Sequence, residues 1–390
     1  MSFIDEALVI YFKAPNSFTG EDVVEFQCHG GVMVASMIVD ALLQYGARLA
    51  MPGEFSKRAF LNNKMDFSQA QAIASLIEAK SEDAARILAR QMRGSLGQFV
   101  DEARESLLHI LAHVEVSIDY AEEDLPTDLL NQIKKMLETF TQKMSQIVQT
   151  SQQRKGLIHG FRVAIVGKPN VGKSSLLNTL LQNERAIISD IAGTTRDTIE
   201  EELRIGTHLV KIIDTAGIRQ SSEKIEQIGI ARSRKAVAEA DIILALFDGS
   251  LCADNQDKEI LSLLKDAKKE IFYIINKSDL PQSFDSSLLP NEPMRLSAKE
   301  DASSLINKLT NYLDSQESGA ELLLTSAHQI HAVSQALEAI NEASYLLEEG
   351  SLELFAFHLN EAINALGLIT RPYGVDEMLD KMFGTFCLGK

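Results

Sequence analysis

Residues Gly167 to Ser174 read Gly-Lys-Pro-Asn-Val-Gly-Lys-Ser, which matches the pattern of a phosphate-binding P-loop. Glycines in such a loop let backbone N–H groups surround phosphate oxygens, and the following helix presents its positive N-terminal end to them. Lys173 can reach the outer phosphates of a nucleotide, and the hydroxyl of Ser174 can bind Mg²⁺. A purely structural glycine turn is the alternative, but it would explain neither Lys173 nor Ser174.

Three further segments follow in order, each at the end of a predicted strand. Asp214–Gly217 (DTAG) offers a carboxylate that can reach Mg²⁺ through water and an amide that can sense a terminal phosphate. In Asn276–Asp279 (NKSD), the carboxylate of Asp279 can accept two hydrogen bonds from the N1–H and amine of guanine. Ser297–Lys299 (SAK) offers a backbone amide for the guanine carbonyl. Adenine lacks that pair of donors, and ligands bind at this edge of open α/β sheets, so the sequence predicts a GTP site.

Gly193–Asp197 (GTTRD) lies between the P-loop helix and the DTAG strand, where a switch loop belongs. A threonine hydroxyl there can complete the Mg²⁺ shell when a γ-phosphate is present. Ile218 follows the DTAG segment, where Ras-like enzymes carry the glutamine that positions water. Catalysis must therefore use another residue or another cation.

Composition excludes several classes of protein. The chain has 390 residues, 45% of them apolar and 24% charged, which is typical of a globular protein with more than one domain. Its net charge of −17 excludes long-range attraction to nucleic acid, so RNA contact would need a local basic patch or a partner. Three scattered cysteines, no long apolar run and no secretory signal at the N-terminus fit a reducing, cytoplasmic setting.

The elements that must position these motifs follow from periodicity. Short strands are predicted at 7–12, 23–27, 161–166, 208–214, 241–248, 271–276 and 294–297. Helical stretches begin near Lys173, Lys224, Asn255 and Asp301, and an alternation of strand and helix predicts a parallel sheet with helices on both faces. Helical patterns before Phe161 and after about Glu321 predict that this GTPase-type α/β domain is inserted into an all-helical domain, preceded by a small α+β domain. Ser68 with Gln71 is a predicted capping box.

Segments outside the nucleotide motifs point to a family. They are Asn16–Asp22, His29–Gly31, Pro52–Phe55, Arg58–Asn62, Lys64–Asp66, the acidic stretch Ile118–Tyr120 with Glu122–Asp124, and Phe386–Lys390. On charge pattern alone, the acidic stretch reads as a solvated loop. Taken together, the chain resembles the MnmE/TrmE family of tRNA-modification GTPases: the first five segments resemble its folate-binding domain, the acidic stretch its helical domain, and the last its C-terminal Cys-x-Gly-Lys signature.

The resemblance implies four regions: a partial folate-binding-like domain at 1–63, a first helical segment at 64–159, the GTPase domain at 160–316, and a second helical segment at 317–390. Family members carry a further segment ahead of the position where this chain begins, so we expect an N-terminally shortened, incomplete folate domain. This shortening predicts weak or absent folate binding by this chain, and it leaves N-terminal dimerisation open.

The resemblance also implies roles for individual residues. Mg²⁺ would be held by Ser174 and Thr195, and K⁺ by Asn170, Ser189, Ile191 and Thr194, at the position where an arginine finger places its charge. Glu226 would orient the attacking water and Lys173 would act on the phosphates; without the resemblance, Glu226 reads as a surface acid at a helix start. The implied GTP-binding residues are Asn170, Val171, Gly172, Lys173, Ser174, Ser175, Ser189, Asp190, Ile191, Ala192, Gly193, Thr194, Thr195, Asp214, Thr215, Ala216, Gly217, Asn276, Lys277, Ser278, Asp279, Ser297, Ala298 and Lys299.

Folate would be bound by Glu25, Lys64 and Lys390. Cys387 has two readings, an inert C-terminal cysteine or a group acting near the folate, whereas Cys28 and Cys252 read as structural. The resemblance thus implies a K⁺-dependent GTPase that modifies carbon 5 of a tRNA wobble uridine. It would act as a homodimer with a flavin-dependent partner of the MnmG/GidA family and a tetrahydrofolate one-carbon donor. The alternative is a GTPase switch in ribosome assembly without modification chemistry.

Overall fold

The structure is a computed structural model that describes residues 3–119, 127–183, 201–213, 234–317, 322–372, 379–380, 383–384 and 386. The chain divides into two compact units. The first comprises Met1–Glu78, Leu88–Gln149 and Leu322–Lys390, and the second comprises Ala79–Ile87 and Thr150–Glu321. Because the long stretch of the second unit lies between two stretches of the first, an α/β domain is inserted into a helical one, as expected.

The N-terminal region of the first unit is a hairpin followed by two helices. Strands β1 (Leu8–Phe12) and β2 (Val23–Gln27) pair antiparallel, and α1 (Val32–Gln44) and α2 (Glu54–Leu61) follow. The strands lie where the sequence predicted them. No residue of α1 is buried, and several large apolar side chains of this segment are exposed. A two-stranded sheet of this kind has little stability of its own.

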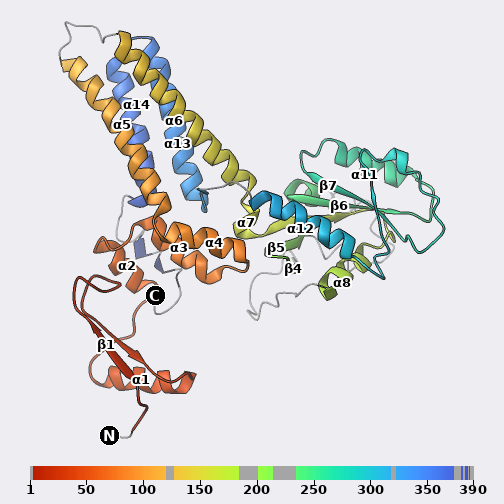
Figure 1. The fold of residues 1–390 in the computed structure, drawn as a ribbon, viewed down its shortest axis with the longest axis horizontal. Helices are drawn as coiled ribbons and strands as arrows, with labels where there is room; N and C mark the ends of the chain where they lie inside the picture. The colour runs from red at the N-terminus through yellow and green to blue at the C-terminus, as the bar shows by residue number, and fades with distance from the viewer. Residues whose placement is uncertain are drawn as a thin grey trace. The chain divides into compact units, whose positions relative to one another are not determined.

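Long amphipathic helices form the core of the first unit. They are α3 (Phe67–Glu78), α5 (Ser95–Asp119), α6 (Thr127–Gln153), α13 (Ala327–Glu348) and α14 (Leu352–Thr370), with α4 (Glu82–Met92) crossing the boundary between the units. Figure 1 shows α5, α13 and α14 side by side, and their apolar stripes meet in one buried cluster that includes Leu107, Ile340 and Leu359. Helices from both sides of the α/β insertion therefore share one core.

The capping box of α3 lies two residues earlier than the sequence predicted. The Asp66 carboxylate accepts from the Gln69 backbone N–H at 2.9 Å, and the Gln69 amide oxygen accepts from the Asp66 N–H at 2.9 Å. Ser68 donates its hydroxyl to Asp66 instead, at 2.6 Å, and Gln71 accepts from Gln329 at 3.1 Å. The prediction of Ser68 with Gln71 was wrong because Asp66, one residue before the helix, satisfies the same N–H groups with a charged acceptor.

The C-terminal segment packs within the first unit. The rings of Phe60 and Phe67 each lie near the ring of Phe383, with centroids 6.2 and 6.5 Å from it. Phe383 forms an apolar cluster with Ala70 and Leu379, and Phe60 packs against that cluster. Lys57 also pairs with Asp380 at 2.5 Å. The described residues of the C-terminal segment are therefore packed against the segment around residues 57–70.

The second unit is built on a six-stranded sheet in the order β4-β5-β3-β6-β7-β8. Its strands are β3 (Phe161–Val166), β4 (Glu201–Ile205), β5 (His208–Ile213), β6 (Ile242–Asp248), β7 (Glu270–Asn276) and β8 (Met294–Arg295). All neighbours are parallel except β4, which pairs antiparallel with β5 and is a strand that the sequence analysis did not predict. The central strands are buried on both faces, which explains their nearly continuous apolar sequences.

Helices around this sheet are α7 (Gly156–His159), α8 (Lys173–Asn183), α11 (Asn255–Lys265) and α12 (Ser303–Glu317), with a 3₁₀ turn η1 at Ser286–Leu288. Leu264 of α11 packs with Ala164, Ala245 and Tyr273 on one face of the sheet. The alternate residues Val163 and Leu244 are equally buried, so the opposite face is covered as well.

Residues 79–87 belong to the second unit because they are fastened to the β4–β5 hairpin. Lys80 pairs with Glu202 at 2.6 Å, and Glu82 pairs with Arg204. The imidazole of His208, itself buried, lies 2.7 Å from the buried carboxylate of Asp83. The hairpin is thus held by three side chains from outside the main stretch of its unit.

Candidate nucleotide-binding site

The predicted P-loop joins the central strand β3 to α8 at the carboxyl edge of the sheet. Asn170 adopts a left-handed backbone with φ 63°, and Gly172 does so with φ 103°. A Cβ at Gly172 would collide with the amide nitrogen of Asn276, so this position requires glycine for space as well as for conformation. β5 and β6 flank β3 on opposite sides, which places the loop where ligands bind in open α/β sheets.

Lys173, the residue predicted to act on the phosphates, has its ammonium inside the loop. It donates to the carbonyl oxygens of Gly167 at 2.7 Å and Lys168 at 2.8 Å. Burial lowers the pKa of Lys173 to about 8, because removal from water penalises the charged form. Ser174 and Ser175 follow in the first turn of α8, and the Ser174 side chain is exposed at the predicted Mg²⁺ position.

Asn276 joins the phosphate loop to the segment predicted to contact guanine. Its side-chain amide donates to the Val171 carbonyl at 2.7 Å, and its oxygen accepts from the Ala298 N–H at 2.8 Å. Asn276 is only 2% exposed. Thr179 of α8 adds a third link by donating to the Ala298 carbonyl at 2.6 Å. The structure therefore brings the P-loop, the NKSD segment and the SAK segment together at one edge of the sheet.

The residues near Asn276 and Ala298 in sequence differ in how far they are exposed. Lys277, with φ 63°, donates to Asp248 at 2.5 Å, and Ser297 is buried. The side chains of Ser278, Asp279 and Lys299 are exposed at the same edge. An exposed Asp279 carboxylate can accept from a base that lies over this edge without leaving a hydrogen bond within the fold.

Asp248, at the end of β6, is a site residue that the sequence analysis missed. Burial opposes its ionisation, but hydrogen bonds from Lys277 and Ser250 outweigh that cost and lower the pKa of the Asp248 carboxyl. The Asp248–Lys277 pair fixes the backbone between Asn276 and Asp279. A carboxylate closing an otherwise apolar strand was the signal available in the sequence.

Several predicted residues lie outside the ranges that the structure describes. They are Ser189, Asp190, Ile191, Ala192, Gly193, Thr194 and Thr195 of the switch segment, Asp214, Thr215, Ala216 and Gly217 of the DTAG segment, Glu226, Cys387 and Lys390. The same holds for Tyr120 and for Glu122 to Asp124 of the acidic stretch.

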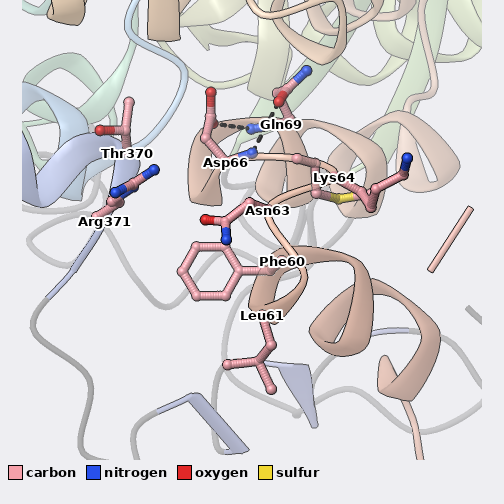
Figure 2. A pocket seen from close by; sticks show the side chains of 9 residues that line it. Phe60, Leu61, Asn63, Lys64, Asp66, Gln69, Thr370 and Arg371 are labelled. Atoms are coloured by element: carbon pink, nitrogen blue, oxygen red, sulfur yellow. Dashed lines mark hydrogen bonds between the residues drawn. The ribbon is translucent and has the colours of Figure 1, made fainter. Parts of the chain in front are cut away.

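The predicted folate-binding residues occupy two places in the first unit. Glu25 is exposed on β2. Lys64 lines a cavity of about 360 Å³, and its ammonium donates to the Pro15 carbonyl at 2.7 Å. Figure 2 shows Lys64, Asp66 and Gln69 on one side of this cavity and Arg371, which directly follows α14, on the other. Within the described residues, no hydrogen bond or ion pair joins Glu25 to Lys64.

The remaining single residues are less informative about chemistry. Cys28 and Cys252 are free thiols, the first half-buried and the second exposed. His29 pairs with Asp5 at 2.9 Å, and its hydrogen bonds lower the pKa of the Asp5 carboxyl. Among the described residues, no group of three or more His, Cys, Asp or Glu side chains could hold a metal ion. In those same ranges, no helix has the length and apolar composition needed to span a membrane.

A P-loop after the central strand, with NKSD and SAK segments linked to it, is the arrangement of a P-loop GTPase domain. Residues 67–387 match the family described as MnmE helical domain, and residues 1–64 match the family described as GTP-binding protein TrmE N-terminus. The chain belongs to the MnmE family of tRNA modification GTPases, as the sequence resemblance predicted, and it is a GTPase.

Similar proteins cover nearly the whole chain. The tRNA modification GTPase MnmE of Aliarcobacter butzleri is 58% identical over 388 residues, which are 99% of this chain and 87% of that protein. The MnmE of Campylobacter curvus is also 58% identical, over 100% of this chain and 86% of that protein. Among solved structures, Aquifex aeolicus Era bound to GDP and AlF₄⁻ is 29% identical, with a TM-score of 0.30, covering 46% of this chain and 66% of that one.

Proposed function

We propose that this chain uses K⁺-dependent GTP hydrolysis to drive modification of carbon 5 of a tRNA wobble uridine, adding an aminomethyl or carboxymethylaminomethyl group. The role in tRNA modification rests on membership of the MnmE family. The observation that supports the guanine site most directly is Asn276, which bonds to both Val171 and Ala298 and leaves Asp279 exposed beside them. Residues 160–316 would form the GTPase domain, flanked by helical segments at 64–159 and 317–390.

In this proposal, the residues of the P-loop would bind the phosphates of GTP and the cations that offset their negative charge. Lys173 would exchange its two carbonyl acceptors for phosphate oxygens, which is a small movement because the ammonium already lies in the loop. Ser174, which is exposed, would hold Mg²⁺ together with Thr195 through their hydroxyl oxygens, and the ion would neutralise negative charge on the phosphates. Asn170, whose side chain is exposed at the loop, would join Ser189, Ile191 and Thr194 around K⁺. Glu226 would orient the attacking water.

The hydrolysis proposal is tested by comparing K⁺ with Na⁺ at equal ionic strength. We expect faster GTP turnover in K⁺, and we expect Asn170→Ala to reduce that difference. Glu226→Ala should lower kcat by about 10²–10³, with little change in GTP affinity, since it removes one positioning group. Equal turnover of the wild-type chain in both salts would remove the cation mechanism while leaving the GTPase assignment intact.

The one-carbon unit would come from a tetrahydrofolate. The cavity lined by Lys64 and Arg371 offers cationic groups to the carboxylates of such a ligand, and Glu25 could accept from pterin N–H groups. Lys390, and Cys387 near it, would complete the site. Calorimetry with 5-formyl-tetrahydrofolate tests this: Lys64→Ala should weaken binding, whereas Lys57→Ala, which breaks a pair with Asp380, should not. Unchanged binding after Lys64→Ala would refute this site.

The chain would act as a homodimer with a flavin-dependent partner of the MnmG/GidA family and with tRNA. Leu8, Val9 and Tyr11 of β1 and Val24 and Phe26 of β2 are exposed, and apolar surface of that extent is typical of an interface. Light scattering with Val24→Glu should show a shift toward monomer. A dimer unaffected by this substitution would place the contact elsewhere.

The modification itself is tested in cells. Wobble nucleosides from a strain that carries only the Glu226→Ala variant should lack the carbon-5 substituent by mass spectrometry. Full modification, together with a defect in ribosome assembly, would favour the alternative of an assembly GTPase. The match of residues 1–64 to the TrmE N-terminal family supports the modification proposal, because an assembly switch has no need for that segment.

A further inference from the structure

The second residue of the P-loop, Lys168, has a side chain that is buried in the protein. It is only 7% exposed, and its ammonium lies 2.8 Å from Asp254 and 2.7 Å from Asp257. Burial opposes the charge, but the two carboxylates outweigh it and raise the pKa of Lys168. The phosphate-binding loop is therefore fastened by a charged side chain to a helix that follows it by more than 80 residues.

The two carboxylates belong to a capping box at the start of α11. The Asp254 side chain accepts from the Asp257 N–H at 3.1 Å, and the Asp257 side chain accepts from the Asp254 N–H at 3.1 Å. Asp257 is 1% exposed, and its second carboxylate oxygen has no hydrogen-bond partner in the structure. Lys168 thus provides the counter-charge for a buried carboxylate. Its ion pairs connect the P-loop to the start of α11, which the capping box holds in a fixed conformation.

The same residue is joined to the lysine that acts on the phosphates. The carbonyl of Lys168 accepts from Lys173 at 2.8 Å, while its side chain is tied to Asp257. A shift of the Lys168 backbone would therefore displace the acceptor of Lys173 and the loop between them. Lys168 also neutralises the charge of Asp254 and Asp257, and without it these carboxylates beside the loop would repel a polyphosphate.

We propose that Lys168 is a positioning residue for GTP binding and hydrolysis, which holds the phosphate loop in register by its ion pairs with Asp254 and Asp257. It touches neither phosphate nor base and acts through the loop backbone and Lys173. The proposal rests on the GTPase activity of the family and adds a residue to it.

The test measures GTP hydrolysis and unfolding by urea for Lys168→Met, Lys168→Arg and the double variant Lys168→Met with Asp257→Asn. Lys168→Met should lower kcat/KM for GTP by about 10- to 100-fold, mainly through KM, because a misplaced loop weakens phosphate contacts in ground state and transition state alike. Lys168→Arg keeps the charge and should recover most of the activity. Glu239→Gln, which breaks the Arg162–Glu239 pair at the other end of β3, is the matched control and should leave hydrolysis unchanged.

The double variant separates positioning from stability. The Asp257→Asn side chain can still accept the capping hydrogen bond but leaves no buried charge unpaired. The free energy of unfolding in urea should therefore return close to that of the wild type. If Lys168 positions the loop, KM stays high in this double variant. Recovery of KM together with stability, or a loss in Lys168→Met confined to kcat at unchanged KM, would mean that Lys168 only supports the fold and would overturn the proposal. A wild-type chain without GTP hydrolysis would instead contradict the GTPase assignment.

Discussion

Asn276→Ala should damage both the stability of the second unit and its affinity for GTP. The substitution leaves the Val171 carbonyl and the Ala298 N–H without their partner at a position that is 2% exposed. Each buried group that loses its hydrogen bond costs about 1–3 kcal/mol, so we expect a loss of about 2–6 kcal/mol in the free energy of unfolding. The phosphate loop and the SAK segment would also lose their common link, and GTP affinity should fall with stability.

Asp279→Asn is the matched comparison, because Asp279 lies three residues away but is exposed. Its unfolding free energy should stay within about 0.5 kcal/mol of the wild type, since surface substitutions rarely do more. GTP affinity should fall by about two orders of magnitude, as two charge-assisted hydrogen bonds are lost, and binding of a xanthosine nucleotide should improve. Circular dichroism suits the urea titrations, because the chain contains no tryptophan. Wild-type stability in Asn276→Ala, or unchanged GTP affinity in Asp279→Asn, would refute the reasoning.

Two further predictions concern protonation and chain packing. Burial lowers the pKa of Lys173 to about 8, and the negative charge of bound phosphate should raise it again, so GTP binding at pH 8.5–9 should take up a proton. Calorimetry in two buffers of different ionisation enthalpy should detect this uptake. Absence of uptake would mean that Lys173 stays charged without nucleotide. By the same linkage, the unfolded chain binds more protons above pH 8, so this group alone makes stability rise with pH from about 8 to 10.5. Gly53→Ala and Gly350→Ala both place alanine at positive φ, which costs about 1–2 kcal/mol of stability in each variant. Only at Gly53 would the new Cβ also collide with the Phe383 carbonyl. Gly53→Ala should therefore unfold at clearly lower urea than Gly350→Ala, and equal midpoints would contradict the packing of the C-terminal segment.

Sequence patterns predicted the strands best where both faces are buried or the ends are marked by polar residues. The bounds of β3 and β2 agree with the prediction, and β7 begins one residue earlier. β4 was missed because Glu201–Ile205 opens with two glutamates and forms an edge strand, whose outward residues need not be apolar. The capping box of α3 was misplaced because a serine and an aspartate two residues apart offer the same pattern, and the pattern does not say which one the helix end meets.

Residues that act through distant partners could not be predicted from spacing. The contacts of Asn276 with Val171 and Ala298 join segments that are far apart in the chain, although each segment was recognised by its own pattern. No sequence pattern assigned a role to Lys168, because its partner Asp257 has no local pattern beyond a helix start. Such pairs form only when the fold brings the two segments together, and the sequence of one chain does not show which distant residues will be close in space.

The lysines at this edge of the sheet differ in what holds them, and that difference explains how a chain with a net charge of −17 can bind a polyphosphate. Lys168 and Lys277 are held by the carboxylates of Asp257 and Asp248, so the charge of each lysine neutralises a buried acid near this edge. Lys173 is held by neutral carbonyl oxygens, in a setting that makes its charge costly. A phosphate oxygen is a better partner for a buried ammonium than a carbonyl oxygen, because its negative charge offsets the charge of the ammonium and a neutral carbonyl oxygen does not. Exchange of acceptors at Lys173 is therefore favourable, whereas exchange at the other two would expose a carboxylate. We therefore expect local hydrogen bonding at Lys173, and not the field of the whole protein, to hold the phosphates of GTP.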